Sequence, residues 1–454
     1  MSRRKSSPKT MTDAQRLAKN QRIKDTMNAT RKRRSGMDCK VYSVKVSRSR
    51  LNGTQKESLT RLFLEAKWVR NALIDSGDYT RESLKKFRDE VPVHTPDGVV
   101  FRPVTVLGGQ IAQSVLSELK SNLKQLSSLK KSGRKVGKLK FCTEVTSIDF
   151  VQYGNSWKLD VDNSTIKLAN IPGWLKVHGL KQIPEGAECA NAKLVKRPSG
   201  YYIHITTYVP KKKNHVQPGT AIGIDMGVKT GITLSDGSKI NTVFEEPERL
   251  RRLRRKLSRQ KKGSNKYQKT WNLINQELEK LSHKRDDAAN KLVHEIAKNE
   301  AIYFQDENIS GWKNKKSKAR GSKKIHRGIL GRVKSRLKNL DNAVCLDRYL
   351  PTTQLCVCGK KNPHGLDKRI YSCPSCGYTE DRDVHAALNM IRIGRFLDEN
   401  NSTDLGQIRT PVEFPVRPAK MLSYNMEAGT ETVKREAAMS LAPAVGHNCS
   451  QRHY

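Results

Sequence analysis

Acidic side chains stand at three places in the chain where a strand or helix is predicted to end or begin. Asp225 ends an apolar strand pattern in AIGIDMGVKTGITLSD (221–236), Glu307 follows AIYFQ, and Asp383 precedes the helical pattern VHAALNMIR. Three carboxylates brought together from separate elements can bind two divalent ions about 3.5–4 Å apart. Hard oxygen ligands suit Mg²⁺ or Mn²⁺. Such a pair would activate water and stabilise the leaving oxygen in phosphodiester cleavage.

The first of these sites is typical of two protein classes. Strand alternation places Gly223 and Asp225 on one face, and Gly227 leaves room for a metal or phosphate to approach the backbone. In ribonuclease H-like nucleases such an Asp holds metal, whereas in actin-like ATPases and sugar kinases the glycines cradle phosphate. The ATPase class requires a second phosphate-binding loop, which the sequence lacks, and it leaves the charge and the cysteines unexplained.

The other two acidic sites leave alternatives open. Gln305 and Glu307 share one face of their strand and Asp306 points to the other, and an ordinary acidic strand end would look the same. Asp381 and Asp383 both precede a helix, where Asp also serves as a cap.

Four of the nine cysteines form a cluster with the spacing of two metal-binding knuckles. They are Cys356, Cys358, Cys373 and Cys376. Four thiolates at this spacing predict a closed, structural Zn²⁺ site, close enough to Asp383 to position it. The first knuckle is one residue short, so His364 is an alternative ligand. An odd number of cysteines with one cluster indicates a reducing compartment rather than a disulfide framework.

The charge of the chain indicates a polyanionic partner. Its 454 residues carry 87 Lys and Arg against 44 Asp and Glu, a formal net charge of +43. Four stretches, 1–36, 120–140, 249–269 and 313–338, hold 43 of the 87 basic residues. Nucleic acid is the commonest large polyanion. A mean hydropathy of −0.70 and no apolar run of roughly 18 residues exclude a membrane protein. No secretory signal is visible in residues 1–30.

Hydrophobic spacing predicts the order of the elements. Residues 1–36 lack an apolar repeat, which predicts a flexible basic arm. Alternation over 38–48 predicts a strand, 54–140 follows helical spacing, and 141–209 returns to short strands. The first strand would join the later ones in a small barrel, which makes the helical segment an insertion in it.

Taken in order, the motifs resemble those of the TnpB family, the transposon-encoded RNA-guided nucleases related to miniature type V CRISPR effectors. They are GIDMGVKTGITLS (223–235), RLRRLRRKLSRQKKGSNKY (249–267), QDENISGW (305–312), PTTQLC (351–356), CPSCGY (373–378) and DRDVHAALNMI (381–391). The resemblance is strongest over 220–393. The sequence departs from the family at His385, where Asn is usual, and at Gln305, near which the family's second acid would fall.

The resemblance implies a multidomain α+β fold. A RuvC (ribonuclease H-like) nuclease domain would contain an inserted zinc ribbon, and a small β-barrel wedge domain would contain an inserted helical recognition domain. The implied boundaries are a flexible basic arm at 1–36, a wedge strand at 37–53, the recognition domain at 54–140, the wedge barrel at 141–218, the nuclease domain at 219–349 and 381–395, the zinc ribbon at 350–380, and a flexible tail at 396–454.

The resemblance also implies an RNA-guided endonuclease that cleaves double-stranded DNA beside a short flanking motif. Its partners would be a guide RNA from the transposon end and the target DNA, and its cofactors Mg²⁺ or Mn²⁺, and Zn²⁺. Asp225 and Asp383 match the first and third catalytic, metal-binding acids of the family. Glu307, two residues beyond Gln305 and on the same face, would serve as the second, with Asp306 in reserve. The residues expected to contact nucleic acid are Arg251, Arg252, Arg254, Arg255, Lys315, Lys316, Lys323 and Lys324.

Several alternatives share these features. A compact type V CRISPR effector differs only in the source of its guide, and a guide-dependent repressor would bind DNA without cutting it. A direct transposase lacks support, since no Tyr or Ser nucleophile motif is evident. The expected location is the bacterial or archaeal cytoplasm, in association with the nucleoid. The sequence leaves open the guide, the flanking motif, the cleavage pattern and the oligomeric state.

Overall fold

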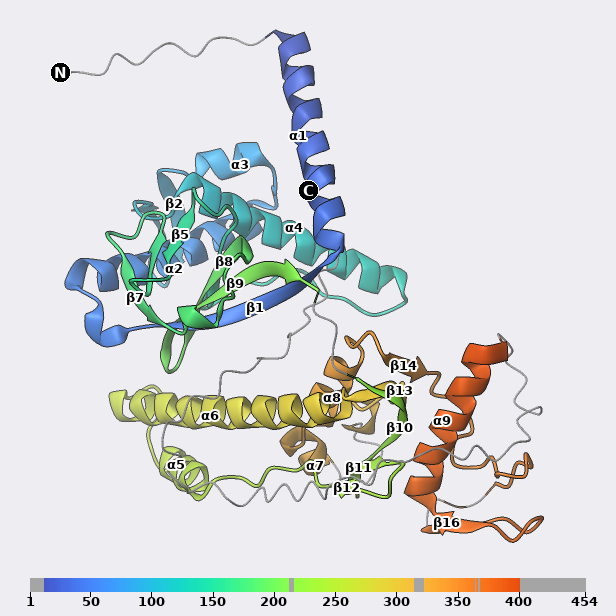
Figure 1. The fold of residues 1–454 in the computed structure, drawn as a ribbon. Helices are drawn as coiled ribbons and strands as arrows, with labels where there is room; N and C mark the ends of the chain where they lie inside the picture. Colours follow the sequence, from blue (N-terminus) through green and yellow to red (C-terminus); the bar gives the residue numbers. More distant parts are fainter. Residues whose placement is uncertain (1–11, 212–215, 314–321, 364, 366–367, 401–454) are drawn as a thin grey trace, which may run out of the picture. The chain divides into compact units, whose positions relative to one another are not determined.

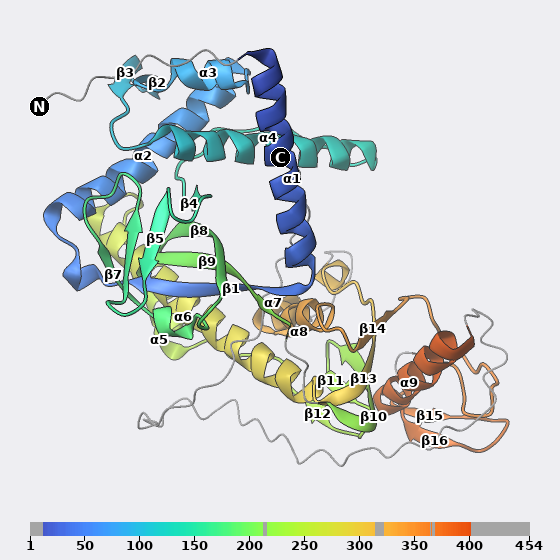
Figure 2. The same cartoon turned by 45° about the horizontal axis from the view of Figure 1, so that its top comes forward.

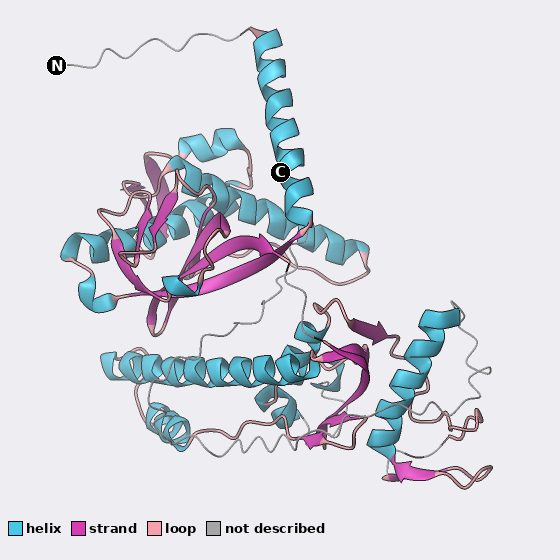
Figure 3. Ribbon diagram, viewed as in Figure 1, coloured by secondary structure: helices cyan, strands magenta, loops and turns pink. Residues whose placement is uncertain are grey.

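The computed structural model describes residues 12–211, 216–313, 322–363, 365 and 368–400 (Figure 1). The chain divides into two compact units, one up to residue 212 and one from residue 213 to residue 446. Each unit contains both helices and sheets (Figure 3). The fold is therefore multidomain α+β, as the sequence predicts. Among the described helices, none combines the length and the apolar character that a membrane span requires.

The first unit is built from a seven-stranded sheet, a two-stranded hairpin and a set of helices. Its helices are α1 (Asp13–Ser35), α2 (Gly53–Ser76), α3 (Arg81–Lys86) and α4 (Gly109–Lys131). Its strands are β1 (Met37–Val46), β2 (Glu90–Thr95), β3 (Gly98–Pro103), β4 (Ser147–Phe150), β5 (Trp157–Asp160), β6 (Thr165–Leu168), β7 (Leu175–His178), β8 (Glu188–Arg197) and β9 (Gly200–Pro210).

The second unit has the same mixture of elements. Its strands are β10 (Gln217–Gly227), β11 (Gly231–Leu234), β12 (Lys239–Ile240), β13 (Asn299–Gln305), β14 (Ala343–Leu346), β15 (Ile370–Ser372) and β16 (Thr379–Asp381). Its helices are α5 (Glu248–Ser258), α6 (Asn265–Ile296), α7 (Ser322–Arg327), α8 (Leu330–Leu337) and α9 (Arg382–Asn400). The helix α9 extends past residue 395, where the sequence predicts a tail, and residues 401–454 lie outside the described part.

β1 lies in the middle of the first unit's seven-stranded sheet, whose order is β4-β8-β9-β1-β7-β6-β5. It pairs antiparallel with β9, from Met37 opposite Pro210 to Lys45 opposite Tyr202, and with β7 at its end. The segment from α2 to α4 is therefore inserted in the chain between two strands of one sheet. The hydrogen-bonded order ends at β4 and β5, so the described ladder is an open sheet where the sequence predicts a closed barrel.

The inserted helices and the sheet share one hydrophobic core. Leu59 and Leu62 of α2 and Leu119 of α4 are fully buried. They belong to the same cluster as Ile166 of β6 and Ile203 of β9. The helical segment thus buries its apolar stripe against the sheet and not within a core of its own.

A hairpin interrupts the segment that the sequence predicts as helical only. β2 pairs antiparallel with β3, and Thr95 lies opposite Gly98 across the turn. The turn is Thr95-Pro96-Asp97-Gly98, and Pro-Asp-Gly is a strong turn signal. The β-branched and aromatic residues on either side favour strands, which the search for helical spacing overlooked.

α1 is a helix where the sequence predicts a flexible arm. The N–H of Gln15 donates to the Thr12 hydroxyl, and the N–H of Thr12 donates to the Gln15 side chain, which completes a capping box. None of its residues is buried. Capping and good helix-forming residues account for the helix without an apolar face, and for that reason hydrophobic periodicity does not reveal it.

Glu65 of α2 carries a buried negative charge, its side chain being 0% exposed. It accepts hydrogen bonds from Arg61 (2.7 Å) and from the backbone N–H groups of Thr105, Val106 and Leu107 (2.9, 2.8 and 2.7 Å). Burial would raise the pKa of Glu65, but these hydrogen bonds outweigh burial and lower it. The carboxylate therefore fastens the segment before α4 onto α2.

Replacing Glu65 by Gln should lower the free energy of unfolding by about 3 kcal/mol, because it leaves buried donors and Arg61 without their partner. Since the folded-state pKa is lowered, the wild-type stabilisation is present above the unfolded-state pKa of about 4.3 and is lost as the pH falls through the folded-state value. Urea unfolding at several pH values measures both effects. Glu57→Gln, at an exposed position of the same helix, is the control and should change little. Equal stability of the two variants at pH 7 would contradict the assignment.

The second unit's main sheet has the order β12-β11-β10-β13-β14. β10 pairs antiparallel with β11 and parallel with β13, and β13 pairs parallel with β14. Because parallel strands end at the same edge of a sheet, the carboxyl ends of β10, β13 and β14 lie together.

Helices cover both faces of this sheet. Ile222 and Ile224 of β10 share a core cluster with Leu292 of α6 and Val333 of α8. On the other face, Tyr303 of β13 packs in a cluster with residues of α9, which crosses the sheet beside β10 (Figure 1). The edge where the strands end is thus enclosed by helix on both sides.

Candidate active site

Asp225 and Glu307 stand at the carboxyl ends of neighbouring parallel strands. Ile224 of β10 lies opposite Phe304 of β13, so the two strands reach the sheet edge at the same level. Asp225 is the next residue of β10, and Glu307 lies two residues beyond the end of β13. Both side chains are half-buried. The hydrophobic alternation of each strand and the parallel register together bring these two acids to one edge.

Gly223 lets α9 lie directly on β10. A Cβ atom at Gly223 would lie 1.8 Å from the carbonyl oxygen of Ala387, so any other residue would push the helix away. Strand alternation places Asp225 on the same face as Gly223. The acid therefore points to the side of the sheet on which α9 begins.

Asp383 lies in the first turn of α9 and is 7% exposed. Its Oδ2 atom accepts hydrogen bonds from the Thr230 hydroxyl (3.2 Å) and from Arg369 (3.3 Å), and Oδ1 accepts one from Arg382 (3.2 Å). Thr230 belongs to the turn between β10 and β11. The carboxylate of α9 is therefore tied to the hairpin that contains Asp225.

Asp381 is the residue that caps α9. Its Oδ1 atom accepts hydrogen bonds from the backbone N–H groups of Asp383 and Val384 (3.0 and 3.2 Å), and Oδ2 pairs with Lys239 (2.6 Å). The capping role that the sequence leaves open between the two acids belongs to Asp381. The side chain of Asp383 is directed to the hairpin instead.

The three carboxylates act on one another electrostatically. Burial, together with the negative charges of Asp383 and Glu307, raises the pKa of Asp225 to about 7. Burial also raises the pKa of Glu307. Such crowding of negative charge is unfavourable unless a cation is near, and carboxylate oxygens are the donors that Mg²⁺ and Mn²⁺ prefer. The donor set therefore fits a divalent cation.

The carboxylates are less closely gathered than the cysteines. Among the His, Cys, Asp and Glu side chains of the described residues, only those of the cysteine cluster have ligand atoms close enough together to hold one metal ion. The carboxylate of Asp383 forms salt bridges with Arg369 and Arg382. The structure thus places the three acids within electrostatic reach but not in a closed ligand sphere.

Asp306, the reserve candidate for the second catalytic position, forms ion pairs with three basic side chains instead of facing Asp225. Its carboxylate pairs with Lys334 (2.7 Å), Lys338 (2.6 Å) and Arg348 (3.1 Å). The hydrogen bonds from Lys334 and Lys338 hold the pKa of Asp306 well below its usual range. This residue joins β13 to α8 and to the segment after β14.

Gln305 is also occupied. It is 6% exposed, and its amide donates to the backbone carbonyls of Asp347 and Leu350 (both 2.9 Å) and accepts from the Thr352 hydroxyl (3.2 Å). Gln305 thus anchors the loop after β14. Of the three neighbouring candidates, Glu307 is the one whose charge raises the pKa of Asp225.

The four cysteine sulfurs all lie within 4.8 Å of one another. The Sγ atoms of Cys356 and Cys376 are 3.4 Å apart, and those of Cys358 and Cys373 are 3.8 Å apart. Four sulfurs bound tetrahedrally at about 2.3 Å from a zinc ion would be separated by about 3.8 Å. The cluster therefore fits zinc. The alternative ligand, His364, lies outside the described residues.

Three buried polar side chains of α9 pack against the segment that contains the four cysteines and the strands β15 and β16, here called the cysteine ribbon. His385, Asn389 and Arg392 lie on one face of the helix. The ring of His385 stacks on Tyr371 of β15 with centres 3.8 Å apart. Asn389 donates to two backbone carbonyls just before the first knuckle (2.8 and 2.6 Å), and Arg392 donates to the carbonyl of Cys356 (3.3 Å). His385, at which the sequence departs from the TnpB pattern, thus packs on the ribbon.

Sequence reasoning missed this docking face. The i, i+4, i+7 spacing of polar residues in an otherwise apolar helix was the available signal. The contacts connect the ribbon directly to the helix whose first turn contains Asp383.

The basic residues expected to contact nucleic acid are only partly described. The arginines of α5 are exposed. Glu248 pairs with Arg251 (3.0 Å), Arg252 (3.2 Å) and Arg255 (3.8 Å). Glu246 pairs with Arg254, and Glu277 of α6 pairs with Arg249 (3.3 Å). Lys324 of α7 is exposed, whereas Lys315, Lys316 and the side chain of Lys323 lie outside the described part. α5 therefore presents more positive charge than its acids neutralise.

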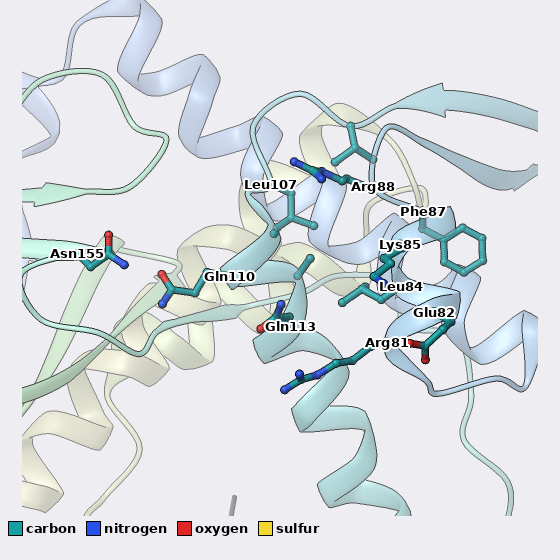
Figure 4. A pocket seen from close by; sticks show the side chains of 13 residues that line it. Arg81, Glu82, Leu84, Lys85, Phe87, Arg88, Leu107, Gln110, Gln113 and Asn155 are labelled. Carbon is teal, nitrogen blue, oxygen red and sulfur yellow. The ribbon is translucent and has the colours of Figure 1, made fainter. Parts of the chain in front are cut away.

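A cavity of about 740 Å³ opens in the first unit (Figure 4). Its volume falls in the ~300–1,000 Å³ range of ligand pockets. No sequence motif predicts this cavity. Three positively charged side chains, one acid, three amides and several apolar side chains line it, among them Arg81, Lys85, Arg88, Glu82, Gln110, Gln113, Asn155, Leu84, Phe87 and Leu107. The amides of Gln110 and Asn155 both donate to Gln152 (2.9 and 3.1 Å), which fixes their orientation.

Two family models match the chain. The model OrfB_IS605, described as "Probable transposase", matches residues 204–302, and the Cas12f1-like TNB domain model matches residues 338–390. The first match contains β10 with Asp225, and the second contains the four cysteines and Asp383.

Two curated relatives are similar over part of their length. A protein of Streptomyces pristinaespiralis named "Putative RNA-guided DNA endonuclease" is 25% identical over 265 residues, which is 55% of this chain and 62% of the relative. "Putative RNA-guided DNA endonuclease InsQ" of Escherichia coli (strain K12) is 28% identical over 269 residues, which is 54% of this chain and 66% of the relative. The chain thus spans just under two thirds of the length of each.

Two solved structures match the chain with low identity and low TM-scores. A Cas12f1–sgRNA–target DNA complex matches with 17% identity and a TM-score of 0.38, over 74% of this chain and 82% of that chain. A CRISPR-Cas12f ternary complex matches with 16% identity and a TM-score of 0.26, over 74% and 81%. The two family models, the two curated relatives and the order of the motifs all agree with the resemblance of this chain to the TnpB family.

Proposed function

We propose that the protein is an RNA-guided endonuclease that cleaves double-stranded DNA next to a short flanking motif. The observation that supports this proposal most is the crowding of negative charge around Asp225, whose pKa is raised by burial and by the charges of Asp383 and Glu307. Carboxylates grouped in this way inside a chain of net charge +43 are suited to metal-dependent chemistry on a polyanion. The names of the two curated relatives agree with it.

In this proposal the second unit's main sheet is a RuvC-type, ribonuclease H-like nuclease core. Three antiparallel strands, β12, β11 and β10, continue into the parallel strands β13 and β14, and acids follow the first and fourth strands in chain order. The cysteine ribbon is inserted before α9. The seven-stranded sheet of the first unit would be the wedge domain, and α2 to α4 its inserted recognition domain.

Asp225, Glu307 and Asp383 would hold the divalent ions, Mg²⁺ or Mn²⁺. When bound, such ions activate a water molecule and stabilise the leaving oxygen of the phosphodiester. The protein's own part is to keep the carboxylates in place. β10 fixes Asp225, the turn after β13 fixes Glu307, and Thr230 and the docked ribbon orient Asp383.

The positive charge would serve mainly to bind RNA and the DNA backbone. Base pairing with a guide supplies sequence specificity, so the protein needs to recognise only duplex shape, phosphates and one short motif. The exposed arginines of α5 suit the phosphate contacts.

The cavity of the first unit is a candidate surface for reading the flanking motif. Gln110, Gln113 and Asn155 offer amides that can pair with base edges, while Arg81 and Lys85 can contact phosphates beside them. Gln113→Leu should therefore relax the flanking-motif preference at one position by about 5–100-fold, since a good base contact contributes ~1–3 kcal/mol. Cleavage of a plasmid library with randomised flanks measures the preference. Gln125→Leu, at an exposed position of the same helix α4 but outside the cavity, is the control. An unchanged preference profile for Gln113→Leu would reject this use of the cavity.

Sequencing the RNA that copurifies with the protein, expressed from its native locus, tests the function directly. The expected RNA derives from the transposon end, and the purified complex should cut a plasmid that carries the matching target in the presence of Mg²⁺. RNA from a CRISPR array would assign the chain to the compact type V effectors instead. Guide-dependent binding without cutting would make it a repressor.

A further inference from the structure

α1 is a highly charged helix that the rest of the first unit does not cover. Over Asp13–Ser35 it carries eight Lys and Arg side chains against two Asp, and none of its residues is buried. Both views show it leaving the sheet at the start of β1 (Figures 1 and 2).

The C-terminal end of α1 is the anchored end. Arg33 and Arg34 both pair with Glu188 of β8 (2.9 and 2.7 Å). The guanidinium of Arg34 also lies over the ring of Tyr208, 4.4 Å from its centre. These contacts, with the direct continuation into β1, hold the helix in a defined place. In the described part of the chain, the side-chain hydrogen bonds of the turns from Asp13 to Lys32 join residues three or four apart in the same helix.

The positive charge of α1 exceeds the negative charge of the acids near it. Arg16, Lys19 and Arg22 follow one another at intervals of three residues, so their like charges are neighbours on the helix. Of the two acids of the helix, Asp13 pairs with Arg16 (3.2 Å) and Asp25 accepts a hydrogen bond from Gln21 (2.9 Å). A helix without tertiary packing is marginally stable in water, and uncompensated positive charge weakens it further. A partner that supplies negative charge would stabilise it.

The distribution of the charges indicates the kind of partner. At about 100° per residue, with Arg16 taken as 0°, Lys32 lies at about 160° and Arg22 at about 240° around the axis, so the cations point to all sides of the helix. A membrane surface would require an apolar stripe opposite the cations, and only Leu17, Ile23 and Met27 are large and apolar in these 23 residues. Cations on all sides match a site with phosphates on more than one side, which a paired nucleic-acid stem provides.

We propose that α1 binds the phosphate strands of a paired stem in the guide RNA. This inference rests on the proposed function. RNA is favoured over target DNA because the charge of α1 requires compensation whenever the protein is folded, and the guide is the partner that stays bound. The contacts are to the backbone, so binding tolerates sequence changes and depends steeply on salt.

The test compares two charge-matched variants of the full-length protein. R16Q/K19Q/R22Q removes three cations of α1 while keeping helix-forming residues. K158Q/K167Q/K181Q removes three exposed cations from elsewhere in the same unit. The probes are a fluorescent 20-base-pair RNA hairpin and a DNA hairpin of the same sequence, each titrated at several salt concentrations after removal of copurified nucleic acid.

The α1 variant should bind the RNA hairpin at least tenfold more weakly than the control variant, with a salt slope reduced by about 2–3, as expected for three lost phosphate contacts. Equal affinities of the two variants for the RNA hairpin would overturn the proposal. A selective loss for the DNA hairpin would overturn it in favour of target DNA. If the wild-type protein bound neither hairpin, the proposed function itself would fail.

A measurement on the unmodified protein tests the proposal without depending on the correct folding of a variant. Amide hydrogen exchange over residues 13–32 should slow on addition of the RNA hairpin, because a helix held by a partner opens less often. Exchange that is unchanged by saturating RNA would overturn the proposal independently of any substitution.

Discussion

Replacing Asp225 by Ala should reduce DNA cleavage by at least about 10³-fold and leave RNA binding unchanged. Asp225 is the acid on which the charges of Asp383 and Glu307 converge, so its removal dismantles the centre of the proposed metal site. Several kcal/mol of transition-state stabilisation depend on such ions. Cleavage of a guide-matched plasmid and binding of the copurified RNA should be measured on the same preparation.

Neighbouring acids provide the matched controls for this experiment. Glu307→Gln should behave like Asp225→Ala. Asp306→Asn should keep cleavage, because Asp306 is bound to Lys334, Lys338 and Arg348 and serves the fold. Calorimetric titration with Mn²⁺ adds a readout besides activity, and the Asp225 variant should lose most of the heat of binding. Retained cutting by purified Asp225→Ala would reject the site assignment.

Removing zinc should disorder the ribbon and release the start of α9. Closed four-cysteine sites of this kind contribute about 10–16 kcal/mol of binding free energy in small zinc domains, and here Tyr371 and the carbonyl of Cys356 receive contacts from His385 and Arg392. Cys373→Ser, or chelation, should therefore raise the proteolysis and amide exchange of residues 370–392 and abolish cleavage.

The control for the zinc experiment is Cys345→Ser, an exposed cysteine on β14 outside the cluster. It should retain one zinc per chain by elemental analysis and full protection around Asp383. If protection of residues 370–392 survived the loss of zinc, the ribbon would have no part in placing that acid.

The strands of the candidate site were accessible to sequence reasoning because their pattern is local. Alternation around Asp225 and the apolar run before Glu307 predict two strands with acids at their ends, and both strands are present. The choice among Gln305, Asp306 and Glu307 depends on which neighbours each side chain meets. Those neighbours come from α8 and the loop after β14, more than 25 residues away in the chain, so the sequence could not decide it.

Other differences between the predicted and the observed structure lie where hydrophobic spacing carries no information. α1 forms through capping and helix propensity without a buried residue, and the β2–β3 hairpin depends on a turn signal inside a helical segment. The docking of His385 on Tyr371 joins two polar rings that no periodicity connects. In each case the deciding interaction involves a polar group, whose partner a hydrophobicity pattern does not specify.

The common core of the inserted helices and the seven-stranded sheet limits how this protein can be re-engineered. Deleting the segment from α2 to α4 to obtain a more compact protein would remove Leu59, Leu62 and Leu119 from the core that they share with the strands. We expect such a shortened protein to be unfolded. The mouth of the 740 Å³ cavity, by contrast, is outward-facing, and a library confined to Arg81, Gln110 and Gln113 could seek new target preferences at little structural risk.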